Sequence, residues 1–97
     1  MHIVSIQVLR SFWQKYPDAE RPLRAWYVLA EKSSWRSPTG IKTMFGNASF
    51  VGNNRVIFNI KGNDYRLVVI VEYQQGRLFI RFVGTHAEYD RIDPETI

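Results

Sequence analysis

Arg66 and His86 are the two side chains whose types and spacing best suit chemistry in this sequence. They stand twenty residues apart, with Gly76 midway between them. A hairpin that turns symmetrically about Gly76 places the two side chains opposite each other at one end of a sheet, on the same side. An arginine fork binds phosphate oxygens in pairs, and an imidazole transfers protons near neutral pH. The pair predicts a phosphodiester site; the alternative is an arginine that pairs with a carboxylate of the C-terminal segment.

The residues around His86 strengthen this interpretation. Thr85-His86-Ala87-Glu88 has the pattern of a capping box, which places His86 in the first turn of a short C-terminal helix. Tyr89 and Asp90 follow three and four positions later, on the same side of that helix. The helix N-terminus disfavours a charged imidazole, whereas Asp90 favours it. We therefore take Arg66, His86 and Tyr89 as the candidate catalytic residues.

Three further polar residues are candidates for binding phosphate. Lys61 stands in the turn formed by residues 61–64, close to Arg66, where it adds a cation. Asn59 lies on the strand before this turn, and its amide is either structural or a further contact. In the symmetric register Arg81 points to the face opposite Arg66, where it reaches the rim of the sheet or pairs with a carboxylate.

The composition excludes several kinds of site. Cysteine is absent and there are only two histidines, so a disulfide framework, a thiolate nucleophile and a zinc site are all excluded. No glycine-rich phosphate loop or metalloprotease motif is present, so we expect no cofactor and no metal. No apolar run approaches a membrane span, and the first ten residues are too polar for a signal peptide. We expect one domain over residues 1–97, in the cytoplasm and without a membrane partner.

The charge is unevenly distributed along the chain. Residues 1–87 carry twelve basic and five acidic side chains, a net charge of +7, whereas residues 88–97 carry −3. Nine of the thirteen basic residues are arginine, and the chain has three Trp, five Tyr and six Phe. An arginine-rich, aromatic small domain fits a nucleic-acid binder, and it equally fits a basic protein whose charges only solvate it.

Two amphipathic helices are predicted in the first third of the chain. Apolar residues recur every three or four positions from Ile6 to Tyr16, with Ser5 as N-cap, until Pro17 ends the pattern. The second helix begins near Asp18, and its apolar stripe is Leu23, Trp26, Tyr27 and Ala30. Two such helices joined by a short turn pack as a hairpin.

The second half of the chain predicts strands. Residues 33–40 are a loop by composition, and one helical turn follows at 41–45. Strands are expected over residues 2–4, 48–51, 55–60, 65–73 and 77–83. Short Gly- and Asn-containing breaks impose antiparallel connections, and the strand 65–73 is central because it is apolar on both faces. The fold class is α+β, with two N-terminal helices covering one face of a four- to five-stranded antiparallel sheet and the other face forming the wall of a shallow cleft.

Two stretches read Phe58-Asn59-Ile60-Lys61-Gly62-Asn63-Asp64-Tyr65-Arg66-Leu67-Val68-Val69 and Ile80-Arg81-Phe82-Val83-Gly84-Thr85-His86-Ala87-Glu88-Tyr89-Asp90. These stretches resemble the HigB-type toxins, mRNA interferases of the RelE/ParE superfamily from bacterial type II toxin–antitoxin modules. The resemblance extends to the opening Met1-His2-Ile3 and to the break at Lys15-Tyr16-Pro17, and is least clear over residues 33–54.

The resemblance implies the RelE/ParE-like fold already described and a metal-independent cleavage of mRNA in the ribosomal A site. It also implies a HigA-like antitoxin with a helix-turn-helix domain, through which alone the toxin would meet operator DNA. Related toxins carry arginine at the position of Arg66 and a basic residue at that of His86. This chain departs from the RelE branch by having histidine at 86, and Asn59 with a single Lys61 in place of a lysine pair.

The mechanism that the resemblance implies is attack of a ribose 2′-OH on the adjacent phosphate. Arg66 would clamp the phosphate with help from Lys61, His86 would transfer a proton, and Tyr89 would stack on a base or assist the leaving oxygen. With Asn59 and Arg81, these residues complete the predicted RNA-binding set. The alternatives are a ParE-like poison of DNA gyrase, a non-catalytic RNA- or ribosome-binding domain, and a face that mainly serves the antitoxin.

Overall fold

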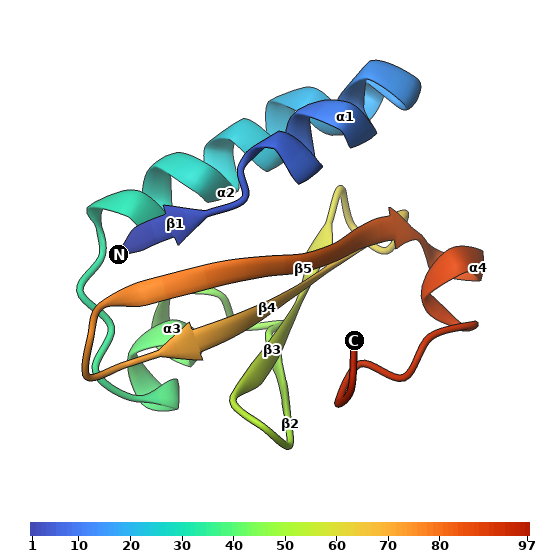
Figure 1. Cartoon of the computed structure of the whole chain (residues 1–97). Helices are drawn as coiled ribbons and strands as arrows, with labels where there is room; N and C mark the ends of the chain where they lie inside the picture. The colour runs from blue at the N-terminus through green and yellow to red at the C-terminus, as the bar shows by residue number, and fades with distance from the viewer.

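The computed structural model describes all 97 residues, as four α-helices, one short 3-10 helix and five strands. The elements run in the order β1 (His2–Val4), α1 (Gln7–Lys15), η1 (Pro17–Ala19), α2 (Glu20–Lys32), α3 (Pro38–Met44), β2 (Ser49–Val51), β3 (Arg55–Ile60), β4 (Tyr65–Glu72), β5 (Arg77–Thr85) and α4 (His86–Tyr89). Figure 1 shows α1 and α2 lying side by side along one side of the sheet. The predicted α+β class is confirmed.

The sheet is mixed, whereas the sequence predicted an antiparallel one. Its order is β1-β5-β4-β3-β2, so β2 to β5 form the predicted antiparallel meander and β4 is the central strand. The difference is β1, which pairs with β5 in the parallel direction. A parallel neighbour needs a long crossover, and the segment between β1 and β5, residues 5–76, provides it.

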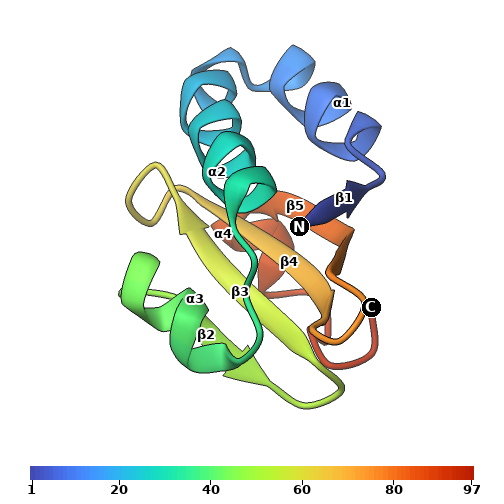
Figure 2. The ribbon, with the colours of Figure 1, turned by 90° about the vertical axis from the view of Figure 1, so that its left-hand side faces the viewer.

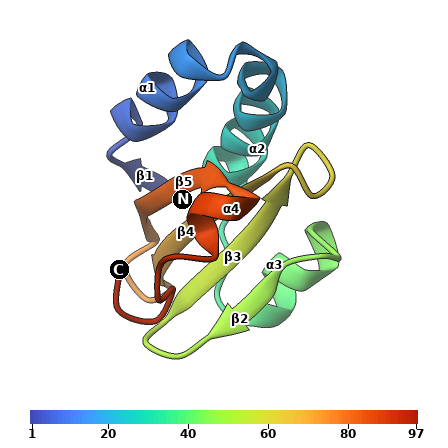
Figure 3. The same cartoon turned by 90° about the vertical axis from the view of Figure 1, so that its right-hand side faces the viewer.

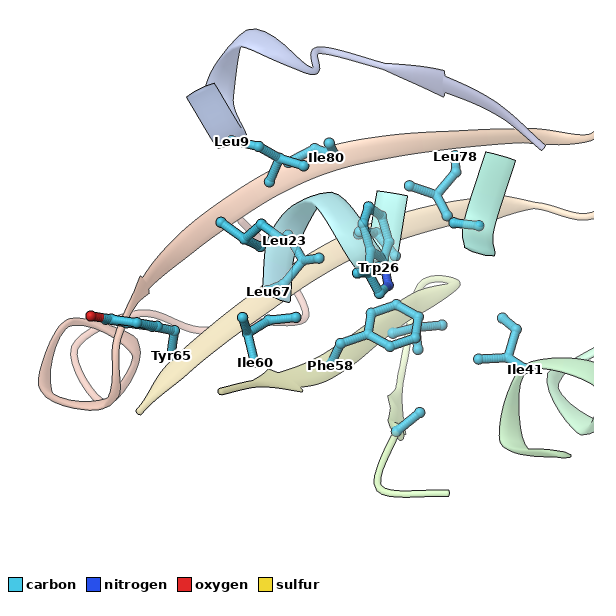
Figure 4. Packing of buried hydrophobic residues seen from close by; sticks show 14 of the residues in the cluster. Leu9, Leu23, Trp26, Ile41, Phe58, Ile60, Tyr65, Leu67, Leu78 and Ile80 are labelled. Atoms are coloured by element: carbon cyan, nitrogen blue, oxygen red, sulfur yellow. The ribbon is translucent and has the colours of Figure 1, made fainter. Parts of the chain in front are cut away.

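The core lies between the helices and one face of the sheet. Leu23, Trp26 and Ala30 of α2 are buried, as their spacing predicts, and Tyr27 at the edge of the stripe is half-buried. The ring of Trp26 meets that of Phe58 edge-on at 5.4 Å between centroids. Figure 4 shows these residues packed with Leu67 of the central strand. Because close packing of this kind is rigid, it also fixes the position of the opposite face of β4.

The starts of α1 and α3 differ from the sequence prediction. Ser5 does not cap α1: it has a positive φ of 73°, and Ile6 holds the N-cap position without a side-chain cap. Ser5 instead accepts a hydrogen bond from the Val8 amide through its main-chain oxygen. The helix α3 is longer than the single predicted turn because Pro38 takes one of its first positions, for which its fixed φ is suited.

The two faces of the sheet are covered by different parts of the chain. Figure 2 shows α2, α3 and the connection between them in front of one face. Figure 3 shows the opposite face, with α4 and the C-terminal segment in front of it. Val68 and Ile57, a cross-strand pair, are buried on this second face, apart from the main core. The central strand is therefore apolar on both sides, as predicted, because both sides are covered.

Candidate active site

Arg66 occupies the middle of a row that crosses three strands. Its partner on β3 is Asn59, and its partner on β5 is Gly84. The sequence predicted His86 as the cross-strand partner of Arg66, and this register is wrong by two positions. The reason is that β4 and β5 are joined by the turn 73–76, whose centre precedes Gly76. A bulge between Val68 and Val69 then adds one residue to β5. His86 consequently lies just beyond the strand, in the first position of α4.

The guanidinium of Arg66 has no carboxylate partner. Its Nη1 donates to the main-chain oxygen of Asn63 at 3.1 Å and approaches that of Tyr65 at 3.5 Å. Its Cζ lies 5.9 Å from the centre of the Tyr89 ring. The alternative interpretation, an arginine engaged by a carboxylate of the C-terminal segment, is therefore wrong. A cation held only by carbonyl oxygens and an aromatic ring keeps its charge available to an anion.

The local structure of His86 follows the predicted capping box. The Glu88 amide donates to the Thr85 hydroxyl at 3.1 Å, and the Thr85 amide donates to a Glu88 carboxylate oxygen at 2.8 Å. The His86 amide donates to the Asp64 main-chain oxygen at 3.2 Å, which ties α4 to the turn before β4. This bond explains how His86 comes to the end of the sheet where Arg66 lies, although the two are not cross-strand partners.

The imidazole is exposed and oriented by one neighbour. His86 Nδ1 lies 3.1 Å from Asp90 Oδ2, the predicted spacing of four residues. An ionised carboxylate only accepts hydrogen bonds, so beside ionised Asp90 the proton belongs on Nδ1. The other ring nitrogen, Nε2, has no partner in the protein, and 54% of the side chain is exposed. Nε2 is thus the atom available for proton transfer.

Gly84 gives α4 the space to fold back over the sheet. A Cβ at this position would lie 2.5 Å from Phe82 Cζ and 3.1 Å from Glu88 Oε1. Any other residue would therefore displace the Phe82 ring or the carboxylate that completes the capping box. Because that box holds His86 and Tyr89, the glycine next to Arg66 is part of what positions the site.

Lys61 and Asn59 lie near Arg66 but are engaged locally. The Lys61 ammonium lies 3.0 Å from Asp18 Oδ2 and 3.2 Å from Asp64 Oδ2. Hydrogen bonds to these carboxylates, that of Asp18 first, raise the pKa of Lys61 above its ordinary value. The Asn59 amide donates to Asn63 Oδ1 at 3.3 Å. Both residues therefore support the turn that holds Arg66.

Arg81 lies on the same face as Arg66, contrary to the prediction. It is the residue that the bulge adds to β5, between Ile80 and Phe82, which pair with Val69 and Val68. An added residue interrupts the alternation of faces on which the symmetric register depended. Arg81 is exposed, and its Nε donates to the Ile97 main-chain oxygen at 3.2 Å.

Sequence reasoning missed Arg55, which donates to the same Ile97 oxygen. Arg55 pairs with Ile70 in the ladder, and Ile70 lies on the Arg66 side of β4 because it stands four residues further along. The signal in the sequence was the position of Arg55 at the start of a strand whose side chains alternate between the two faces of the sheet.

The site lies on an open surface. Four cavities, of about 240 to 360 Å³, are present, and none is lined by Arg66, His86 or Tyr89. The shallow cleft expected on this face is not among them. No three His, Asp or Glu side chains lie close enough together to ligate a metal ion. None of the helices is long and apolar enough to span a membrane.

Beneath the site, Asp18 joins the helical layer to the start of the central strand. The Tyr65 hydroxyl donates a hydrogen bond to Asp18 Oδ1. This bond, followed by that from Lys61, lowers the pKa of Asp18, and it raises the pKa of Tyr65 to about 12. Tyr65, the residue next to Arg66, is thus fixed to η1, the short helix between α1 and α2.

We expect acid to destabilise the protein through Asp18. A carboxylate whose pKa is lowered by folding stabilises the fold above its unfolded value of about 3.9, and this contribution is lost as the pH falls through the lower folded value. Denaturant unfolding between pH 2 and 7 should show a smaller loss of stability on acidification for Asp18→Asn than for the wild type. Glu72→Gln, which removes a carboxylate that forms no ion pair at the end of β4, should follow the wild type. Equal acid profiles for Asp18→Asn and the wild type would contradict the assignment.

Comparison with known proteins places these residues in a recognisable sequence context. Residues 19–92 match the family model described as HigB_toxin, RelE-like toxic component of a toxin-antitoxin system. The chain is 30% identical over 93 residues to the mRNA interferase toxin HigB of Escherichia coli K12, covering 93% of this chain and 88% of that protein. It matches the mRNA interferase HigB of Shigella flexneri to the same extent. The mRNA interferase HigB of Escherichia coli O6:H1 is 27% identical over 94 residues, covering 95% of this chain and 91% of that protein.

Proposed function

Since the chain belongs to the HigB family, the RelE-like toxic components of toxin–antitoxin systems, we propose a site and a setting for its reaction. As a member of this family it is a toxin and an mRNA endoribonuclease with an antitoxin partner. We assign catalysis to Arg66, His86 and Tyr89. The observation that carries this assignment is that the Arg66 guanidinium has no carboxylate partner and lies beside the ring of Tyr89. Tyr89 and His86 belong to the same short helix.

The reaction we propose uses a nucleophile within the RNA. The 2′-OH oxygen attacks the adjacent phosphorus, the bond from phosphorus to the 5′ oxygen breaks, and the products carry a 2′,3′-cyclic phosphate and a 5′-OH. One proton leaves the 2′-OH, and one is delivered to the 5′ oxygen. The enzyme has to hold the phosphate in line and stabilise the added negative charge of the pentacovalent state.

Each residue of the cluster has a part in this reaction. Arg66 donates its fork to the non-bridging phosphate oxygens and stabilises the charge that develops on them. His86 exchanges a proton through Nε2 while Asp90 holds Nδ1. The Tyr89 ring stacks on a base, a contact that contributes about 1–3 kcal/mol, or its hydroxyl assists the leaving oxygen. An open surface admits a polymer at this point without a lid.

Asn59 and Arg81 extend this face as RNA contacts, and Lys61 adds a cation at the end of the sheet, next to Asp64. The ion pairs of Lys61 with Asp18 and Asp64 are exposed, and exposed pairs contribute little, so a phosphate can replace one carboxylate. Asn59 stands beside Arg66 in the ladder, and Arg81 lies on the same face further along the sheet. Contacts of this kind position RNA without selecting its sequence.

The setting we propose is the ribosomal A site in the cytoplasm. An exposed site whose histidine and arginine lie on an open surface lacks the enclosure that positions a free substrate, and a ribosome would supply that positioning. The proposed antitoxin is HigA-like, with a helix-turn-helix domain through which the complex would bind operator DNA. The toxin itself needs no cofactor or membrane in this scheme.

Primer extension on a reporter mRNA in a translating extract tests the function. We expect new 5′ ends within codons when the message is translated, and none when initiation is blocked. Toxin treated with EDTA and desalted should give the same ends, because the proposed mechanism uses no metal ion bound to the toxin. The treatment precedes the assay so that ribosomal magnesium is unchanged. His86→Ala protein serves as the matched inactive control.

The same experiment discriminates the alternatives. New ends that arise without translation would overturn the ribosomal setting. If no new ends arise under any condition while DNA damage is induced in cells, the protein acts as a gyrase poison instead. Inhibition of translation by His86→Ala equal to that by the wild type would favour a non-catalytic RNA- or ribosome-binding domain.

A further inference from the structure

The turn between β3 and β4, residues 61–64, holds two of the groups to which we assign catalysis. The Asn63 main-chain oxygen accepts a hydrogen bond of 3.1 Å from Arg66 Nη1. The Asp64 main-chain oxygen accepts one of 3.2 Å from the His86 amide. Figure 1 shows this turn, in yellow, at the end of the sheet where α4 begins. The relative positions of Arg66 and His86 therefore depend on the conformation of four residues that belong to neither strand.

The backbone of this turn needs support from outside. Lys61 has a φ of 52° and Gly62 a φ of 65°, so both lie in the left-handed region. Glycine enters this region without a steric penalty, whereas the Cβ of lysine meets one. A residue other than glycine persists in such a conformation where the surrounding structure holds it there. The contacts of the Lys61 side chain therefore help to fix the shape of the turn.

One carboxylate outside the turn contacts the residues at both of its ends. Asp18 Oδ2 lies 3.0 Å from Lys61 Nζ, and Asp18 Oδ1 accepts a hydrogen bond from the Tyr65 hydroxyl. Asp64, the other partner of Lys61, belongs to the turn itself. Asp18 is the only residue of the helical layer that is hydrogen-bonded to residues 61–65. It therefore joins the turn to η1.

The tyrosine side of this link is rigid. The Tyr65 ring is 6% exposed, and its centroid lies 5.2 Å from that of Phe12 and 5.7 Å from that of Tyr16. Figure 4 shows Tyr65 at one end of the core, with its hydroxyl directed away from the other labelled residues. A ring packed in this way keeps its hydroxyl in one place, where it orients the Asp18 carboxylate. The same carboxylate is thereby oriented toward Lys61.

We propose that Asp18 is a positioning residue for RNA cleavage, which fixes the turn whose main-chain oxygens hold the Arg66 guanidinium and the His86 amide. This role rests on the proposed function, because it takes Arg66 and His86 as the catalytic groups. Asp18 is hydrogen-bonded to neither of them. A catalytic group misplaced by about 1 Å costs about 100-fold in rate, so a residue that acts only on geometry has a measurable effect.

Single-turnover cleavage on ribosomes programmed with a defined mRNA tests this role. For Asp18→Ala we expect a rate about 10- to 100-fold below that of the wild type at saturating toxin. The toxin concentration that gives half of the maximal rate should not rise, which separates positioning from lost affinity. Asp18→Asn keeps an oxygen that accepts from the Tyr65 hydroxyl but loses the charge opposite Lys61, so its rate should lie between the two.

A second variant tests the same link from its other end. Tyr65→Phe removes the hydroxyl and keeps the packed ring, so it remains informative if Asp18→Ala does not fold. Its cleavage rate should also fall. In the double variant the loss should be smaller than the product of the two single losses, because both substitutions remove one and the same hydrogen bond.

Amide hydrogen exchange measured by NMR reports the turn without any RNA. In Asp18→Ala the amide of His86, which donates to the turn, should exchange faster than in the wild type. The amide of Leu67, in the buried centre of the sheet, should keep its wild-type rate. A general loss of stability would accelerate both, so the comparison separates a displaced turn from a weakened fold.

Glu20→Ala is the matched control. Glu20 is also an acidic residue at the start of the second helical segment, in an exposed ion pair of 2.7 Å with Arg24, but it has no hydrogen bond to the turn. Its cleavage rate and its His86 amide exchange should equal those of the wild type. A wild-type rate in folded Asp18→Ala and Tyr65→Phe, or an equal loss in Glu20→Ala, overturns the positioning role.

Failure of this role is distinguishable from failure of the proposed function. If the wild type cleaves translated mRNA and folded Asp18→Ala cleaves at the same rate, only the positioning role is wrong. If the rate falls but the amides of His86 and Leu67 accelerate together, the loss is one of stability and the positioning role is again wrong. If the wild type cleaves no mRNA, the proposed function fails and the positioning role fails with it.

Discussion

Replacing His86 with alanine should lower the rate of mRNA cleavage by about 10²–10⁴-fold, the usual contribution of a positioned proton-transfer group. The fold should be retained, because more than half of the imidazole is exposed and the capping box depends on Thr85 and Glu88 instead. The measurement is the single-turnover cleavage rate on ribosomes programmed with a defined mRNA. Circular dichroism on the same samples shows whether the fold is intact.

Two variants define what the His86 result means. His2→Ala removes the only other histidine, which is exposed in β1, and should leave the rate unchanged. Asp90→Asn keeps an acceptor for Nδ1 but removes the charge, so the rate should fall by less than in His86→Ala. Cleavage by His86→Ala at the wild-type rate would remove His86 from the mechanism.

Replacing Arg66 with alanine should lower the cleavage rate by about 10²–10³-fold, comparable to the loss of one preorganised donor to a transition-state oxyanion. The reason is that Arg66 is the cation beside Tyr89 that no carboxylate neutralises. Single-turnover rates measured at saturating toxin separate this effect on the chemical step from weaker binding of the ribosome or the message.

Charge alone should not restore the activity lost at Arg66. Arg66→Lys keeps the cation but loses the planar fork, so its rate should remain well below that of the wild type. Arg77→Ala, at the other end of β5, is the matched control and should cleave normally. If Arg66→Ala retains the wild-type rate while Arg77→Ala loses activity, the site lies at the opposite end of the sheet.

Local patterns in the sequence predict most of this fold. The apolar stripe of α2, the meander of β2 to β5 and the capping box around His86 all depend on residues within a few positions of one another. Such features are set by side-chain periodicity and by short-range hydrogen bonds. They were sufficient to bring His86, Tyr89 and Asp90 to one side of a short helix.

The relation between strands was less predictable. The partner of Arg66 depends on where the β4–β5 turn is centred and on the extra residue at Arg81, and neither follows from strand propensity. The parallel pairing of β1 depends on contacts between residues that are distant in the sequence, such as His2 and Arg77. That Arg55 lies on the same face as Arg66 follows only from the register of β3 and β4.

The parallel pairing of β1 with β5 has a consequence for the order in which the chain can fold during synthesis. β1 is translated first, but its partner β5 spans Arg77–Thr85, so β1 can join the sheet only after most of the chain has been made. Pairing between residues so distant in sequence also has to close a long loop, which slows folding.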